Sequence, residues 1–564
     1  MPTVPEPIDA SAYRSLGALL ADAFLQFKGQ VALIEAQRER EIVRLTYLEA
    51  RREVARVAGL LEERGIGAGD RVAVLMSNQS RWLLGASAVL IRGGVLVPLD
   101  PKLSGAEQAA LLTHARPAAL LAEHGLLTRI PAHDVGTVLV SEGPAGAELR
   151  WEELAEADWP AVAERDPEDI ATIVYSSGTG GRAKGCMLPH RAYLAQLRAL
   201  QQLFTMRPGH RSFSVLPTNH AIDFLVGFLG PLSSGATVIH QRSLRPELLR
   251  WTMQEYRPTH MAVVPRLLAA LEAALERRLG EQPPVLRHAL DLLSGVNESL
   301  TRRRPRVGLS RRLLAPVHDA FGGELEVLFC GGAFVDRGIA ERLYRLGIPV
   351  AIGYGLTEAC TVATLNDLKP FRADSVGRAV PGVDVRIHDP GPDGVGEVWI
   401  RGPTVMSGYL DEPELTRECL TEDGWLRTGD LGRLDAAHHL HLVGRSRNMI
   451  ITPGGKNVYP EDIEGAFSGL PVEELVVFAT DFVWPRRGGL GDERLVAVVR
   501  PEGRLEEALG PLRERNRTLP EHKRVSGVLP WADPFPRTAS LKVKRRVLAE
   551  ALRAGTSPDR MVAV

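Results

Sequence analysis

Short apolar runs alternate with helical segments over residues 70–123. Unbroken runs of four or five apolar residues predict buried strands, and apolar residues that recur every three or four positions predict helices. The pattern predicts strands at 71–77, 94–100 and 117–123 and helices at 81–92 and 105–114. Strands that alternate with helices indicate parallel sheets covered by helices. Further buried strands are expected at 211–218, 260–265, 325–331 and 349–355.

The pattern changes beyond Pro381, where short strands at 383–390 and 396–403 are separated by Gly and Asp turns. This indicates a smaller, more antiparallel subdomain. After Asp435 a last stretch has its own strands at 474–480 and 494–500. We therefore expect an α/β protein with a large N-terminal domain, residues 1–445, that holds parallel α/β sheets plus the β-rich subdomain. A small, mobile α+β domain is expected over residues 446–564.

Composition excludes several classes of protein. The chain has 564 residues, 45% of them apolar, with 68 basic and 69 acidic side chains. A near-neutral charge does not suit a dedicated nucleic-acid binder, and this apolar content does not suit a disordered chain. The most apolar stretches, 82–99 and 224–239, are interrupted by Arg92 and by Gly230-Pro231, so neither predicts a membrane span.

The start of the chain lacks the basic and apolar regions of a secretory signal. Four cysteines are scattered without metal or disulfide spacing, and each is expected to be a small buried side chain in a reducing cytoplasm. Residues 301–312 are strongly basic. Such a run usually forms a solvated face, and contact with an anionic membrane or with CoA phosphates is the alternative.

The strongest local signal is segment 173–185, where an apolar strand leads into a loop of hydroxyls and glycines that ends at Lys184. Glycines allow close backbone approach, and N–H and O–H donors with a cation match a polyphosphate. It is not a Walker A loop, because Gly185-Cys186 follows the lysine where Ser or Thr is required. A mobile surface loop would have a similar composition. The candidate phosphate ligands are Ser176, Ser177, Gly178, Thr179 and Lys184.

Three further segments carry possible chemistry. Segment 353–359 follows a strand, and ligands bind at strand ends of open parallel sheets, where a carboxylate can hold Mg²⁺. Taken alone, the segment equally allows Tyr354 as a core residue and Glu358 as a surface acid. Segments 428–430 and 444–447 place an Asp on a tight turn and an Arg nearby, which suits ribose hydroxyls, although turn chemistry alone also explains them. By itself, segment 536–545 indicates only a solvated basic tail near the C-terminus. The candidate residues of the other segments are Gly353, Tyr354, Gly355, Thr357, Glu358, Asp430 and Arg445.

The order of these segments over the whole chain resembles the adenylate-forming superfamily of acyl-CoA synthetases, adenylation domains and luciferases. The phosphate loop of that superfamily matches residues 175–185, and its Tyr-Gly-x-Thr-Glu motif matches 354–358. Its Thr-Gly-Asp motif matches 428–430. Its Gly-Arg hinge segment matches from Gly444, and its Pro-Arg-Thr-x-x-Gly-Lys motif matches from Pro536.

Two segments resemble the fatty acyl-CoA synthetase branch. These are residues 454–464 and 216–223, where a Pro-x-x-His segment of the branch lines the acyl pocket and matches His220. Three positions depart from the family pattern. Gly180 replaces a Thr, Ala183 replaces a Pro, and Leu541 replaces the Gly before the catalytic Lys. The last departure leaves open whether Lys542 or Lys544 reaches the acyl phosphate.

The resemblance implies that ATP and Mg²⁺ convert a carboxylic acid into an acyl-adenylate, and that the thiol of coenzyme A then displaces AMP. It implies phosphate contacts for Thr179, Lys184 and Thr357, and it implies Glu358 with Thr179 as metal ligands. Asp430 and Arg445 would hold the ribose, and Tyr354 would stack on adenine. Lys542 would bridge the carboxylate and the α-phosphate.

For the second step the resemblance implies rotation of the C-terminal domain about Arg447, which brings Gly454 to the pantetheine tunnel. Little side-chain bulk at 331–333 and an apolar stretch at 224–230 without a buried charge partner favour a medium or long acyl chain. An aryl acid, or transfer to an acyl carrier protein, is the alternative. Rivals of other classes are a kinase or ATPase and an inactive AMP-binding scaffold.

Overall fold

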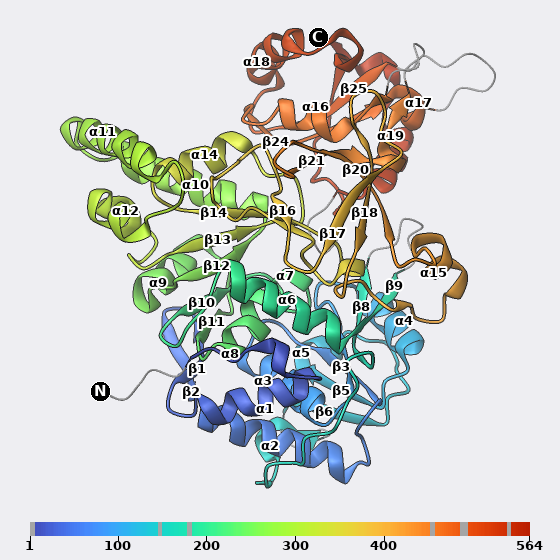
Figure 1. Cartoon of the computed structure of the whole chain (residues 1–564). Helices are drawn as coiled ribbons and strands as arrows, with labels where there is room; N and C mark the ends of the chain where they lie inside the picture. Colours follow the sequence, from blue (N-terminus) through green and yellow to red (C-terminus); the bar gives the residue numbers. More distant parts are fainter. Residues whose placement is uncertain (1–5, 145–148, 177–182, 452–456, 485–493, 538–542) are drawn as a thin grey trace. The chain divides into compact units, whose positions relative to one another are not determined.

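The computed structural model describes residues 6–144, 149–176, 183–451, 457–484, 494–537 and 543–564. The chain divides into two compact units. Figure 1 shows the whole chain, with colours that follow the sequence from the N-terminus to the C-terminus. The first unit contains Met1–Val385 and Ile400–Leu426, and the second contains Arg386–Trp399 and Arg427–Val564. The expected domain boundary after residue 445 lies inside the second unit and stays a prediction.

A nine-stranded sheet forms one half of the first unit, in the order β16-β15-β14-β13-β12-β10-β11-β1-β2. Its six central strands are parallel, while β2 on one edge and β15 and β16 on the other are antiparallel. The strands are β1 Val31–Gln37, β2 Arg40–Thr46, β10 Arg211–Ser214, β11 Thr237–Gln241, β12 His260–Val263, β13 Val327–Cys330, β14 Val350–Tyr354, β15 Thr364–Leu365 and β16 Arg378–Ala379.

An eight-stranded sheet forms the other half, in the order β19-β9-β8-β4-β3-β5-β6-β7. Strands β8, β4, β3, β5, β6 and β7 are parallel, and β9 and β19 add an antiparallel edge. The strands are β3 Arg71–Leu75, β4 Val95–Pro98, β5 Ala119–Glu123, β6 Thr137–Ser141, β7 Leu149–Arg150, β8 Ile170–Ser176, β9 Lys184–Pro189 and β19 Gly408–Tyr409.

Helices cover these sheets as the alternating pattern predicts. The helix expected at 81–92 is α3, Ser80–Ile91, which is buried on all sides except at Arg81 and packs against α1 and α2. The helix expected at 105–114 is α4, Gly105–Ala115, and it begins with a capping box between Ser104 and Glu107. The other helices of the first unit include α1 Leu16–Gln26, α2 Tyr47–Glu63, α6 His190–Leu203, α7 Ala221–Asp223, α8 Gly230–Ser233, α9 Pro246–Tyr256, α10 Pro265–Gly280, α11 Pro284–Thr301, α12 Val307–Leu313, α13 Ala315–Asp319, α14 Arg337–Arg345 and α15 Pro413–Cys419.

The second unit contains the expected antiparallel element. Strands β17 Asp384–His388, β18 Gly396–Arg401, β20 Leu426–Leu434 and β21 Leu440–Arg445 form one sheet, and the boundary of the units runs through the first three. A second sheet follows, made of β24 Val472–Ala479, β25 Leu495–Pro501, β26 Val525–Pro530 and β27 Val562–Ala563. Its two faces carry separate apolar cores, under α16 Pro460–Ala466 and α18 Leu505–Thr518 on one side and α19 Arg545–Gly555 on the other.

The predicted fold class, α/β with parallel sheets, a smaller β-rich part and an α+β C-terminal part, is confirmed. In the part of the chain that the structure describes, no helix combines the length and the apolar character needed to cross a bilayer. Three of the four cysteines are buried as expected, but Cys419 is only half-buried, because it lies in the last turn of the surface helix α15.

Candidate functional site

The strand pair β8–β9 carries the phosphate-loop segment. Ser176 ends β8, Lys184 begins β9, and the two residues face each other across the antiparallel ladder. The strands therefore fix both ends of the loop between them. Ser177, Gly178 and Thr179 lie outside the described residues.

Glu358 lies on a short 3₁₀ turn, Thr357–Ala359, that follows β14. The chain leaves the strand through Gly355, where a Cβ atom would lie 1.8 Å from the carbonyl oxygen of Thr361. A side chain at this position would force the turn apart, so glycine is required here for packing. Gly353 and Tyr354 end β14, and Tyr354 is buried, with 8% of its surface exposed.

The Glu358 carboxylate receives hydrogen bonds from two hydroxyls. Tyr409 donates its phenol O–H to Oε1 at 2.8 Å, and Ser176 donates Oγ–H to the same oxygen at 3.4 Å. The ammonium nitrogen of Lys184 lies 5.1 Å from the centroid of the Tyr409 ring. We call Ser176, Lys184, Glu358 and Tyr409 the Glu358 cluster. The structure thus brings together two predicted segments that are more than 170 residues apart.

The two hydroxyl groups that donate to this carboxylate are neutral. Burial, and then the charge of Glu358, raise the pKa of Tyr409 far above its usual range, so its hydroxyl keeps its proton. Burial likewise raises the pKa of the Cys186 thiol, which lies 3.7 Å from the Ser176 hydroxyl. Carboxylate and hydroxyl oxygens are the hard ligands that Mg²⁺ prefers, so the residues present fit this ion.

His220 lies directly before α7, within the predicted acyl segment 216–223. Its Nε2 atom is 3.5 Å from Oδ2 of Asp100, which is 8% exposed. A π-helical turn, Phe224–Leu229, follows directly, and all six of its residues are buried. Such turns are rare and often occur at functional sites.

Asp223 stands between His220 and this π-helical turn, and it is 1% exposed. Its Oδ2 atom accepts hydrogen bonds from Ser214 at 2.7 Å and from Thr218 at 3.1 Å. Burial raises the pKa of this carboxyl to about 7, against the effect of the two hydrogen bonds. A buried acid therefore adjoins the stretch that was expected to have no buried charge partner, although residues 224–230 themselves are apolar.

Asp430 and Arg445 form an ion pair in the second unit. They face each other across the β20–β21 ladder, and Nε of Arg445 lies 2.8 Å from Oδ1 of Asp430. Thr428, Gly429 and Asp430 lie within β20 and not on the expected tight turn, because β20 continues through them in its pairing with β21. Thr428 donates to the carbonyl of Val398 at 2.6 Å and accepts from the Asp430 amide at 3.0 Å, which holds the strand at this point. Gly429 has φ +69°, a conformation that favours glycine.

The other predicted residues are the hinge residue, the pantetheine-contacting glycine and the two candidate lysines. Arg447 lies on a 3₁₀ turn, Ser446–Asn448, directly after β21. Gly454 and Lys542 lie outside the described residues. Lys544 is exposed at the start of α19, and its amide donates to the carbonyl of Pro536 at 2.7 Å.

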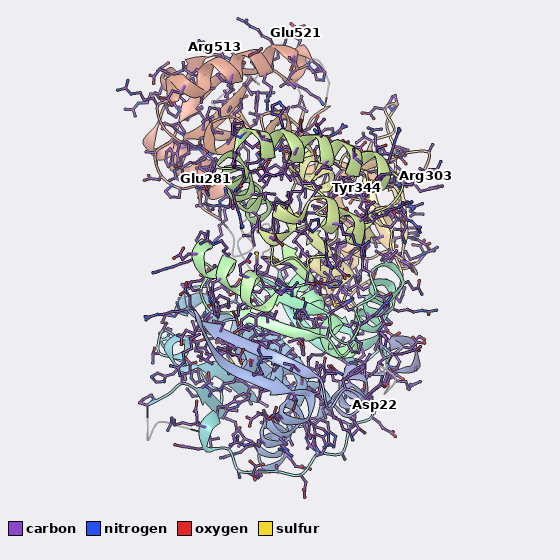
Figure 2. All side chains as sticks on the ribbon, turned by 90° about the vertical axis from the view of Figure 1, so that its left-hand side faces the viewer. Asp22, Glu281, Arg303, Tyr344, Arg513 and Glu521 are labelled. Atoms are coloured by element: carbon purple, nitrogen blue, oxygen red, sulfur yellow. The ribbon has the colours of Figure 1, made fainter. Side chains whose placement is uncertain are left out.

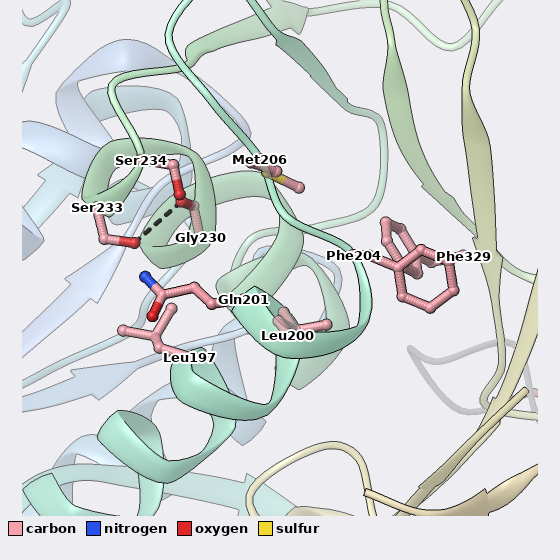
Figure 3. A pocket seen from close by; sticks show the side chains of 9 residues that line it. All are labelled: Leu197, Leu200, Gln201, Phe204, Met206, Gly230, Ser233, Ser234 and Phe329. Atoms are coloured by element: carbon pink, nitrogen blue, oxygen red, sulfur yellow. Dashed lines mark hydrogen bonds between the residues drawn. The ribbon is translucent and has the colours of Figure 1, made fainter. Parts of the chain in front are cut away.

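Two other features are a small cavity and a group of possible metal ligands. Leu200, Phe204 and Phe329 help to line the small cavity in Figure 3, which measures about 10 Å³, room for about one water molecule. His210, His260 and Glu326 form the one group of possible metal ligands found among the described residues. They lie at the amino ends of β10, β12 and β13, the edge opposite Tyr354. The Arg311 guanidinium, 3.9 Å from Glu326, disfavours a cation there.

Sequence reasoning missed three residues of the site, which are Tyr409, Asp100 and Asp223. Tyr409 joins the Glu358 cluster because β19 pairs with β9, where Tyr409 faces Cys186. That pairing joins segments more than 200 residues apart and leaves no local signal. Asp223 could have been noticed, because it is an acid directly before a long apolar run.

Known proteins resemble this chain in sequence and in fold. The model of a family described as AMP-binding enzymes matches residues 20–410. The chain is 31% identical over 517 residues to a feruloyl-CoA synthase of an Amycolatopsis species, covering 88% of this chain and 92% of the relative. It is 28% identical over 464 residues to the long-chain-fatty-acid–CoA ligase FadD15 of Mycobacterium bovis, covering 78% and 75%. The crystal structure of ATP-bound MatB from Rhodopseudomonas palustris superposes with a TM-score of 0.74 at 25% identity, covering 95% of this chain and 99% of that one.

Proposed function

Since this chain belongs to the AMP-binding enzyme family and is an AMP-forming acid–thiol ligase, we propose that its substrate is an apolar carboxylic acid, activated in two steps. ATP and the acid give acyl-AMP and pyrophosphate, and coenzyme A then takes the acyl group and releases AMP. The observation that carries this proposal is the Glu358 cluster. It joins the ends of the phosphate loop to an acidic group at the carboxyl end of β14.

The first step needs residues that manage the charge of the triphosphate. Lys184, with Ser176, Ser177, Gly178 and Thr179, would bind the β- and γ-phosphates, and Thr357 the α-phosphate. Glu358 and Thr179 would hold Mg²⁺, which when bound neutralises phosphate charge. Fixed donors and cations of this kind lower the barrier to phosphoryl and nucleotidyl transfer.

The predicted ribose and adenine residues would hold the nucleoside part. Asp430 would accept hydrogen bonds from the ribose hydroxyls, and Arg445 would donate hydrogen bonds to them. Tyr354, flanked by Gly353 and Gly355, would stack on adenine. Lys542 would contact the acid carboxylate and the α-phosphate while the new P–O bond forms.

The second step would use a different arrangement of the C-terminal part. We infer a boundary between residues 445 and 446, and a rotation about Arg447 that withdraws Lys542 and brings Gly454 to the pantetheine thiol. Large rotations at a few residues between elements are a common form of closure. The alternative acceptor is the thiol of an acyl carrier protein.

The acyl group would lie beside His220 and the buried π-helical turn. The apolar side chains of this turn favour a medium- or long-chain fatty acid. The names of the relatives refer to more than one class of acid, because one names feruloyl-CoA and another names long-chain fatty acids. An aryl acid is therefore the alternative, and a cytoplasmic location is part of the proposal.

The test is acid-dependent pyrophosphate release over a panel of short, medium, long and aryl acids, with and without coenzyme A. We expect release with apolar acids, and AMP rather than ADP as the nucleotide product. Formation of ADP would contradict the proposal in favour of a kinase or ATPase. Stronger activity with aryl acids than with fatty acids would contradict only the acyl assignment.

A pair of variants then locates the catalytic lysine. Lys542→Ala should reduce acyl-AMP formation by about 10²-fold or more and spare thioester formation from supplied acyl-AMP. Lys544→Ala is the matched control, because it removes the same charge two residues away. If the phenotypes are exchanged, the alignment through Leu541 is wrong.

A further inference from the structure

Helix α11 is oriented with its polar residues toward the protein. Its buried side chains are Leu290, Ser294, Asn297 and Thr301. Asn297 donates to the carbonyl of Arg345 at 3.1 Å and accepts from the Ser310 hydroxyl at 2.7 Å. Hydrogen bonds with α12 and α14 therefore hold this face, and Leu290 is the one apolar residue of the helix that is fully buried.

The apolar residues of α11 point away from the protein. Val285 is 83% exposed, Leu292 72%, Val296 49% and Leu300 45%. Their spacing of seven, four and four places them on one side of the helix. We call these four residues the α11 ridge. Single exposed apolar side chains are ordinary, but an aligned row of them marks an interaction surface.

Figure 1 shows α11 at the outer edge of the first unit, and Figure 2 looks onto that side. The labels Glu281 and Arg303 in Figure 2 mark the residues just before and just after the helix. The ridge thus lies between Glu281 and the basic run at 301–312.

Charge at this surface differs from that of the whole chain, which is nearly neutral. Residues 276–312 contain nine arginines, no lysine and four carboxylates. Arg302, Arg303 and Arg304 are exposed, and in the part of the chain that the structure describes no carboxylate forms an ion pair with any of them. The apolar ridge therefore runs directly into free positive charge.

We propose that the α11 ridge and the arginines after it bind the surface of an anionic lipid bilayer. An amphipathic helix with an apolar side and adjacent arginines lies in the plane of such an interface, with its apolar side chains among the acyl chains. Arginines near the surface then add electrostatic attraction to anionic headgroups. No membrane-crossing helix is needed for this mode of binding.

A second copy of this chain fits the surface less well. Two copies that met on the ridge would bring their arginine runs together, and only four carboxylates per copy are present at this surface to offset nine arginines. Like charges of this density oppose association. A nucleic acid fits the arginines but not the exposed leucine and valine side chains.

The test measures co-sedimentation of the full chain with vesicles. We expect binding to an equal mixture of phosphatidylcholine and phosphatidylglycerol, at least about 10-fold weaker binding to pure phosphatidylcholine, and loss of binding as salt rises. Leu292→Glu with Val296→Glu should reduce binding about 10-fold or more. Arg302→Ser, Arg303→Ser and Arg304→Ser together should reduce it up to about 100-fold, at about tenfold per 1.4 kcal/mol.

Leu25→Glu is the matched control, because Leu25 is 58% exposed on α1 and the change is chemically the same. It should leave vesicle binding unchanged, and all variants should keep the thermal unfolding of the parent. Equal binding to both vesicle types, or equal loss with Leu25→Glu, would overturn the proposal. The proposal would also be overturned if the parent does not bind vesicles but forms a dimer in sedimentation velocity, and the Leu292→Glu, Val296→Glu variant is a monomer. Because the measurement does not use activity, it stands or fails separately from the proposed reaction.

Discussion

The Glu358 cluster and the Asp430–Arg445 pair are both made of residues that the sequence singled out, but they are assembled differently. The pair is local, since its two residues lie on adjacent strands of one hairpin and are joined by one ion pair. The cluster is non-local, since β8, β9, β19 and the 3₁₀ turn after β14 each supply one residue. We therefore expect a change in the cluster to alter chemistry strongly, and a change in the pair to affect nucleotide affinity and stability together.

The largest effect is expected for Glu358→Gln. The amide keeps an oxygen for Tyr409 but loses the negative charge, so acid-dependent pyrophosphate release should fall about 10²- to 10³-fold, with a higher requirement for Mg²⁺. Glu41→Gln, on the surface strand β2, is the control and should leave activity unchanged. Unchanged Mg²⁺ dependence in Glu358→Gln would remove Glu358 from the proposed metal site.

Asp430→Asn should come next. Arg445 would lose its carboxylate partner, which is 5% exposed, so the KM for ATP should rise about 10-fold. The free energy of unfolding should fall by about 1–2 kcal/mol, because Arg445 is half-buried and water screens the remaining charge. Titration with ATP and urea unfolding measure the two effects. A loss of stability without any change in KM would make the pair purely structural.

Tyr409→Phe should have a smaller effect on chemistry. The Glu358 carboxylate would lose its 2.8 Å hydrogen bond but keep Ser176, so kcat/KM should fall about 10-fold while the free energy of unfolding falls by about 1 kcal/mol. Tyr193→Phe is matched, since its buried hydroxyl lies 2.8 Å from Thr172. If both variants lose activity equally, general destabilisation explains the loss and Tyr409 does not position Glu358.

The smallest effect on catalysis is expected for Asp223→Asn, which should change how the stability depends on pH. The pKa of this carboxyl is about 7 in the folded chain, against an ordinary value of 3.8. Between these two pH values the folded state therefore binds more protons than the unfolded state. Its contribution to stability therefore falls as pH rises from about 4 to about 7, by roughly 1–3 kcal/mol. The variant should flatten this decline in urea unfolding, whereas Asp166→Asn, at an exposed ion pair, should not. An unchanged slope would contradict the raised pKa.

The regular elements were predictable because their signals are local. Residues 94–100, 117–123 and 349–355 were expected as strands and correspond to β4, β5 and β14, since unbroken apolar runs suit strands buried on both faces. The positions of Glu358 and Lys184 were likewise visible as motifs. Their mutual contact with Tyr409 was not, because strand pairing over hundreds of residues follows from tertiary packing.

Helix α11 shows a second limit of pattern reading. A row of apolar residues at helical spacing normally identifies the face toward the core. Here that rule predicts the wrong buried face. Hydrogen bonds of Ser294 and Asn297 hold the polar face against the protein, and the apolar row lies on the exposed side. Only the exposed fractions of Val285 and Leu292 reveal the inversion.

The path of the chain between the two units limits how this protein can be divided. The chain passes from one unit to the other three times, after Val385, Trp399 and Leu426. A fragment that began at residue 427 would lack Glu397 and Val398, which accept the hydrogen bonds of Gly429 and Thr428. The part of β20 that carries Asp430 would then lose these two hydrogen bonds. Gene fragments exchanged between relatives would therefore need to include residues 386–399 to transfer an intact second unit.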